Sequence, residues 1–144
     1  MVVFLIAISF WRTQVWNSDE WLWREAVEHA PDKLRPRIHL ARALRPDEAI
    51  RVLSDARPLA PDDPTLATEL GQTWMRAGDP ASALREFGKA LALNPRDPNN
   101  YNNRGVALAA LGQDEAARLD FEHALRIDPG LATARSNLRK MEAR

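Results

Sequence analysis

The chain has 144 residues, which is long enough for one domain with a hydrophobic core. Its 20 basic and 20 acidic residues balance, so composition gives no electrostatic reason to expect a nucleic acid or an anionic membrane surface as partner. The absence of cysteine excludes disulfides, thiolate metal sites and thiol nucleophiles. Ten prolines and six glycines lie between apolar segments with helical spacing, which predicts many short helices.

The first predicted element is an apolar segment at residues 1–16, interpreted as a short helix of membrane type. The run Val2–Phe10 is apolar except for Ser9, whereas about 20 such residues are needed to span a bilayer. No basic residue precedes the run and no cleavage site follows it, as a secretory signal would require. Three interpretations stay open: the end of a longer membrane helix, a short anchor on a membrane or membrane complex, or a segment buried against the first helices.

Aromatic residues in this segment favour the membrane interpretations, because their rings prefer the boundary between water and lipid. The predicted membrane-interface residues are Phe4, Phe10, Trp11 and Trp16. The rest of the chain would then be tethered to a membrane and lie in the aqueous phase. The charges that flank the segment are too few and too mixed to predict on which side.

The next predicted element, residues 17–31, is an orphan helix. Ser18 is suited to cap its N-terminus, and Pro31 ends it. Trp23 and Ala26 precede Pro31 with the same spacing that apolar residues and a proline show in the repeats further along the chain. The element is therefore predicted to be the second helix of a repeat that lacks its first helix.

Residues 32–62 are predicted to form a degenerate, shortened repeat. Ala49, Leu53 and Ala56 form one face of its second helix. The proline that ends this helix, Pro61, follows the previous stop by 30 residues instead of 34. Because four residues are about one helical turn, we expect the first helix of this repeat to be shortened by a turn.

Residues 63–96 and 97–130 are two regular repeats, since a shift of 34 positions aligns them with nine identical residues. The identical pairs are Asp63 and Asp97, Pro64 and Pro98, Gly71 and Gly105, Gly78 and Gly112, Ala83 and Ala117, Phe87 and Phe121, Ala90 and Ala124, Leu91 and Leu125, and Pro95 and Pro129. In each repeat the Asp–Pro pair begins a first helix, and the second glycine ends it. The Ala–Phe–Ala face belongs to a second helix, which the last proline stops.

This pattern resembles the tetratricopeptide repeat (TPR) family. The residues that match the family are Leu70, Gly71, Trp74, Ala83, Phe87, Ala90 and Pro95 in one repeat, and Tyr101, Gly105, Leu108, Ala117, Phe121, Ala124 and Pro129 in the next. The second repeat departs from the family at Arg104, where leucine is preferred. The resemblance implies an all-α, right-handed solenoid of antiparallel helix pairs. Residues 131–144 would form the C-terminal capping helix that such an array needs.

The resemblance also implies a site for a partner, because in this family six positions of each first helix face a concave groove. The predicted partner-binding residues are Thr65, Thr68, Glu69, Gln72, Met75, Arg76, Asn99, Asn102, Asn103 and Val106, and the small residues Ala109 and Ala110 end the strip. An asparagine has a donor and an acceptor, with which it could pair with a peptide backbone. Simple polarity at the start of a helix is the alternative explanation for the asparagines.

One ligand class of the family is not expected. The clamp that binds a C-terminal carboxylate needs lysines and an arginine on this strip. In this chain Thr68 stands at the first lysine position, and only Asn103 matches the clamp. A receptor for the acidic tails of chaperones is therefore not predicted.

No catalytic residue, metal site or cofactor is predicted. The three histidines lie in different helices without a partner at ligand spacing. Asp62 and Asp63 are adjacent, so their side chains diverge, and Asp63 already serves as a helix cap. The predicted function is non-catalytic binding of another protein or peptide, with a membrane or membrane complex contacted through the N-terminal segment and no nucleic acid as partner.

Two other functions stay open. The order of Arg12, Trp16, Leu22–Trp23 and Pro31 before the repeats is similar to the end of polytopic, glycosyltransferase-like membrane proteins. In those proteins the last membrane helix runs into a C-terminal repeat domain, so this chain would be the non-catalytic part of an enzyme. The other possibility is a structural subunit that packs through its outer surface, and exposed apolar residues on the second helices would favour it.

Overall fold

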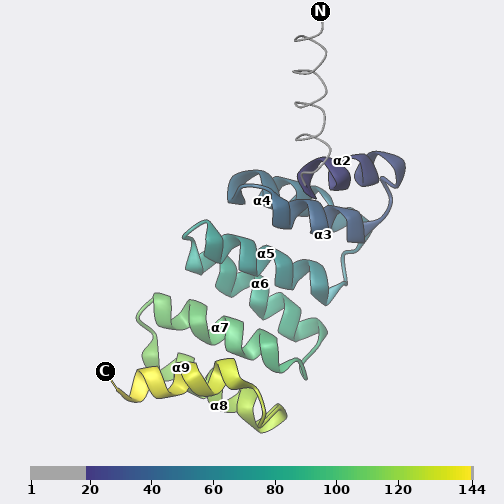
Figure 1. Cartoon of the computed structure of the whole chain (residues 1–144). Coiled ribbons are helices and arrows are strands. Elements are labelled where there is room, and N and C mark those ends of the chain that lie inside the picture. Colours follow the sequence, from purple (N-terminus) through teal and green to yellow (C-terminus); the bar gives the residue numbers. More distant parts are fainter. Residues whose placement is uncertain (1–18, 144) are drawn as a thin grey trace, which may run out of the picture. The chain divides into compact units, whose positions relative to one another are not determined.

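A computed structural model describes residues 19–143 of the chain (Figure 1). In this part the chain forms helices joined by short turns, without a strand. The helices are α2 (Asp19–His29), α3 (Leu34–Ala43), α4 (Pro46–Asp55), α5 (Pro64–Arg76), α6 (Pro80–Leu93), α7 (Pro98–Ala110), α8 (Asp114–Ile127) and α9 (Ala132–Glu142), with a short 3-10 helix, η1 (Arg57–Leu59), after α4. The chain divides into two compact units, of which the first ends at Leu59 and the second begins at Ala60. The predicted all-α class with antiparallel helix pairs is confirmed.

The predicted apolar helix at residues 1–16 lies outside the described residues, as do its aromatic residues Phe4, Phe10, Trp11 and Trp16. The described helices include none with both the length and the apolar character needed to cross a membrane.

Aspartate caps and glycine stops set the ends of the first helices in the second unit. Asp63 caps α5 by accepting a hydrogen bond from the Thr65 backbone N–H, with 2.7 Å between Oδ1 and N. Asp97 caps α7 in the same way. Gly78 and Gly112 follow the two helices with φ values of 79° and 73°, which a residue without a Cβ adopts at little cost.

The pairs α5–α6 and α7–α8 pack through the predicted seams. Phe87 and Phe121 are each 1% exposed. A Cβ added to Gly71 would lie 2.5 Å from Cε1 of Phe87, so the ring occupies the space that the glycine leaves. Gly105 and Phe121 repeat this contact at 2.6 Å. The flanking alanines, which are fully buried, are Ala83, Ala90, Ala117 and Ala124.

The first unit contains the shortened pair α3–α4, with α2 packed against α3. Ala49, Leu53 and Ala56 are all 0% exposed, so the predicted face of the second helix is buried. α3 has 10 residues where α5 has 13, a difference of just under one turn. Trp23 of α2 stacks on His39 of α3 with ring centroids 4.2 Å apart, which gives this histidine a packing role.

α9 covers the end of the α7–α8 pair. It packs against α8 and also contacts α7. Leu138 and Met141 pack against the buried cluster that contains Phe121. Arg139, which is exposed, stands 34 residues after Gly105. α9 therefore has the contacts of a first helix, but it lacks the glycine against which a second helix would pack.

Candidate functional site

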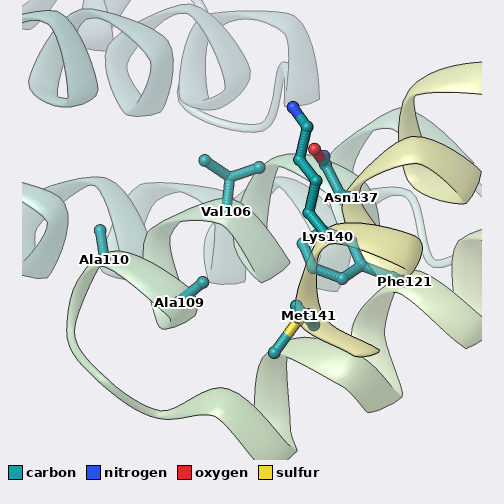
Figure 2. A pocket seen from close by; sticks show the side chains of 7 residues that line it. All are labelled: Val106, Ala109, Ala110, Phe121, Asn137, Lys140 and Met141. Atoms are coloured by element: carbon teal, nitrogen blue, oxygen red, sulfur yellow. The ribbon is translucent and has the colours of Figure 1, made fainter. Parts of the chain in front are cut away.

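The three helices α5, α7 and α9 form a strip along the second unit, since α7 contacts both of the others (Figure 1). Two depressions lie on this strip. The α5–α7 depression, of about 180 Å³, is lined by Gln72, Met75, Phe87, Asn103 and Val106. The α7–α9 depression, of about 280 Å³, is lined by Val106, Ala109, Ala110, Phe121, Asn137, Lys140 and Met141 (Figure 2).

The two depressions are one site that occurs twice, displaced by one repeat. Each lining residue of the α5–α7 depression has a counterpart in the other, 34 positions later. The counterparts are Gln72 and Val106, Met75 and Ala109, Phe87 and Phe121, Asn103 and Asn137, and Val106 and Lys140. Val106 lines both depressions, so they adjoin along α7.

α9 contributes residues to this site that the sequence did not predict. Asn137 and Lys140 line the α7–α9 depression, although residues 131–144 were expected only to cap the array. In Figure 2 both side chains rise from α9 at the edge of the depression, on the side opposite Ala109 and Ala110. Asn137 and Lys140 stand 34 positions after Asn103 and Val106, so the repeat period could have indicated them. However, α9 lacks the glycine and the aromatic residue that mark a repeat.

The predicted partner-binding residues fall into three groups. Those that line the α5–α7 depression are Gln72, Met75, Asn103 and Val106. Those that are exposed but belong to neither lining are Thr65, Arg76 and Asn99. Those that are buried or half-buried outside the linings are Thr68, Glu69 and Asn102. The predicted residues that line a depression thus lie in the middle and the C-terminal halves of α5 and α7.

Thr68 lies at the contact between α5 and α7. Its Oγ1 is 2.9 Å from the carbonyl oxygen of Pro64 and 2.9 Å from Oδ1 of Asn100, and its single proton serves one of them at a time. Asn100 is 0% exposed and donates from Nδ2 to Asp97 at 2.9 Å. This buried asparagine, which the sequence did not single out, orients the start of α7 against α5.

Asn102 joins α7 to α9 in a similar way. It is 8% exposed, and its Oδ1 accepts a hydrogen bond from Nδ2 of Asn137 at 3.0 Å. Its own Nδ2 lies 3.5 Å from Oδ1 of Asn103, at the limit of a hydrogen bond. Asn102 therefore contributes to helix packing, while the half-buried Asn103 stays at the edge of the α5–α7 depression.

Arg104, the departure from the family pattern, has a partner on the second helix. Its guanidinium makes two hydrogen bonds of 2.7 Å to the carboxylate of Asp120, which lies on α8. This contact with Asp120 raises the pKa of Arg104 despite its partial burial, so the guanidinium keeps its charge. The guanidinium also lies 5.4 Å from the ring centroid of Tyr101. The preceding repeat has Leu70 and Glu86 at the positions of Arg104 and Asp120, so this ion pair belongs to the second of the two repeats.

Exposed apolar side chains occur on the second helices as well as on the strip. Leu93 of α6 and Leu119 of α8 are 42% and 52% exposed. Arg85 stands at the position equivalent to Leu119, and Ile127, at the position equivalent to Leu93, is half-buried, so the two exposed leucines are not repeated as an exposed apolar stripe. Among the described residues, histidines and carboxylates do not gather into a group that could hold a metal ion.

Comparison with solved structures gives both the fold and relatives with known ligands. The first TPR domain of human RPAP3 is 32% identical, with 68% of this chain and 77% of that chain covered and a TM-score of 0.65. This domain has also been solved bound to an HSP90 peptide. The second TPR domain of human RPAP3, in complex with an HSP70 peptide, is 22% identical over 67% and 81% of the two chains, with a TM-score of 0.64.

A thermophilic TPR protein of Thermus thermophilus shares the fold over a larger part of the chain. The match covers 85% of this chain and 70% of that protein at 20% identity, with a TM-score of 0.77. No curated protein sequence matches the chain. The sequence model of the tetratricopeptide repeat matches residues 38–98 and 68–132. The chain therefore belongs to the tetratricopeptide repeat family, whose fold generally serves as a non-catalytic scaffold for protein interactions.

Proposed function

We propose that the chain is a non-catalytic interaction module that holds a segment of a partner protein on the strip formed by α5, α7 and α9. The observation that carries this proposal is the pair of repeat-related depressions, which offer apolar surface beside amide groups. Val106, at 36% exposed, lies at their junction. An exposed apolar side chain between two concave surfaces is a suitable centre for a protein contact.

The RPAP3 domains support a peptide as the class of ligand, because both were solved with peptides of chaperones. The proposal does not extend to those particular peptides. Thr68 occupies the first lysine position of the carboxylate clamp, and its hydroxyl is already engaged with Pro64 and Asn100.

Site-specific photocrosslinking in the native cell would test this function. Benzoylphenylalanine is introduced in turn at Gln72, at Val106 and, as a control on the exposed side of α6, at Arg85. We expect the two strip positions to give an adduct with the same protein, and Arg85 to give none. Adducts from Arg85 alone would contradict the proposal and favour a structural subunit that packs through its second helices.

We further propose that the segment 1–16 tethers the module to a membrane. The apolar run Val2–Phe10 and the aromatic residues that follow it support this attachment. In vesicle sedimentation, replacing Phe4 and Phe10 together by aspartate should release the full chain from lipid. Aspartate at the exposed Leu93 serves as the control and should leave binding unchanged. Equal sedimentation of both variants would contradict the tether.

A further inference from the structure

We infer that the strip recognises an extended, internal segment of its partner with two apolar side chains three positions apart, the larger of which has an acidic neighbour. This inference rests on the proposed function and specifies its ligand. It is based on the spacing of the two depressions, on their unequal size and on the charge of one edge.

The spacing of the depressions matches a peptide in the polyproline II conformation. They lie on either side of α7, which contacts both α5 and α9. Packed helices are about 8–10 Å apart. A polyproline II chain rises about 3.1 Å per residue with three residues per turn, so side chains i and i+3 point the same way about 9 Å apart. One side chain can therefore enter each depression.

Free amide groups beside the depressions favour such a chain over a bound helix. A polyproline II segment makes no internal hydrogen bonds, so its backbone needs partners, whereas the backbone of a helix is already paired. The side chain of Gln72 is exposed, and its amide makes no hydrogen bond to another residue of the described part. Among the described residues, the side chain of Asn103 has one contact, in which its Oδ1 lies 3.5 Å from Nδ2 of Asn102. Both can donate to and accept from a peptide backbone.

The two depressions differ in size because small residues replace large ones. Ala109 stands where the α5–α7 depression has Met75, and Ala110 stands one repeat after Arg76. The volumes of about 280 and 180 Å³ reflect these replacements. The α7–α9 depression thus fits an aromatic or leucine side chain, and the α5–α7 depression fits a smaller one such as valine or proline.

A lysine marks the larger depression. Lys140 lines its edge and, among the described residues, has no ion pair (Figure 2). Val106 occupies the equivalent position of the smaller depression, so only one of the two sites has this cation. A carboxylate next to the large anchor would pair with Lys140. A single lysine suits one acidic side chain of a peptide, whereas the clamp that binds a C-terminal carboxylate uses several cations.

Selection of peptides by the full chain would test this ligand class. Random 12-residue peptides are displayed with both ends fused, so that none offers a free carboxylate, and selected sequences are then synthesised as amides. We expect a small and a large apolar residue at i and i+3, in either chain direction, with aspartate or glutamate adjacent to the large one. Fluorescence anisotropy then measures the affinity for each variant.

Two pairs of variants locate the contacts. Ala110→Trp fills the larger depression and should weaken binding about tenfold, the loss of one good apolar contact. Ala92→Trp, at an exposed position of α6, should leave affinity unchanged. Lys140→Glu should weaken binding about fivefold or more, as expected for an edge ion pair. Arg139→Glu makes the same charge change at the preceding residue of α9, which is exposed, and should have less than half that effect.

The outcomes separate the inference from the proposed function. Selected peptides that bind but are insensitive to Ala110→Trp and to Val106→Glu would overturn both, because the strip would not be the site. If Val106→Glu abolishes binding but the selected peptides have their two apolar anchors seven residues apart, as on a helix, the inference would be overturned and the proposed function would stand. The same holds if binding requires a free C-terminal carboxylate, or if Lys140→Glu and Arg139→Glu have equal effects.

Discussion

Single residues decide how closely the helices of the second unit approach each other. Gly71 and Gly105 lie directly under the rings of Phe87 and Phe121, where even one methyl group has no room. The same rings form part of the linings of the two depressions. A change at either glycine would therefore shift a ring that lines one of the two depressions.

Gly71→Ala should destabilise the chain although alanine is the better helix former. The gain in helix propensity is about 1 kcal/mol, whereas overpacking a seam typically costs about 1–3 kcal/mol. Gly88→Ala is the matched control, because a Cβ at this helical position meets nothing within 4 Å. It should stabilise the chain by about 0.5–1 kcal/mol. Urea unfolding of both variants checks the signs, and a stabilising Gly71→Ala would refute the role of the seam.

The pair of Arg104 and Asp120 should be strongly coupled. Arg104→Leu restores the family residue but leaves the carboxylate of Asp120, whose side chain is 9% exposed, without its partner. We expect this variant to lose about 1–3 kcal/mol of unfolding free energy. Adding Asp120→Ala should recover most of the loss, because no buried charge then remains. A double-mutant cycle by urea unfolding measures the coupling, and additive effects would show that the two residues act independently.

At the scale of elements, the ends of the helices follow from local chemistry. Aspartate followed by proline begins α5 and α7, and α6 also begins at a proline after an aspartate. Asp79 caps α6 by accepting hydrogen bonds from the backbone N–H and the hydroxyl of Ser82. These contacts lower the pKa of Asp79, chiefly through the hydroxyl of Ser82.

This lowered pKa predicts a pH-dependent cap. A carboxylate with a depressed pKa in the folded state stabilises fully above its unfolded pKa, and the stabilisation is lost as the pH falls through the folded value. Asp79→Ser keeps a capping oxygen but does not titrate. The urea midpoint of the wild type should exceed that of the variant at neutral pH, and the gap should close below about pH 4. A gap that is constant with pH would contradict this role of Asp79.

At the scale of the whole molecule, the 34-residue period was sufficient to predict the fold class and the buried seams, because caps, stops and small residues act locally. It was insufficient for contacts that form only when helices stack. The burial of Asn100, the pairing of Arg104 with Asp120 and the place of Asn137 in the strip depend on residues 16 to 35 positions away. The roles of residues 1–16 and the resemblance to glycosyltransferase-like proteins stay predictions.

The division into two compact units predicts that damage to the core stays within one unit. Leu53→Ala, at a position 0% exposed in α4, should cost about 2–5 kcal/mol and speed hydrogen exchange in α3 and α4 while α7 and α8 stay protected. Phe121→Ala should show the reverse pattern and also abolish peptide binding, because Phe121 lines the larger depression. Hydrogen-exchange mass spectrometry of both variants shows which helices lose protection. Fluorescence anisotropy with the selected peptide measures whether binding is lost as well. If each substitution lowered protection equally in both units, the chain would unfold as one cooperative body, and the binding strip would depend on the first unit as much as on its own helices.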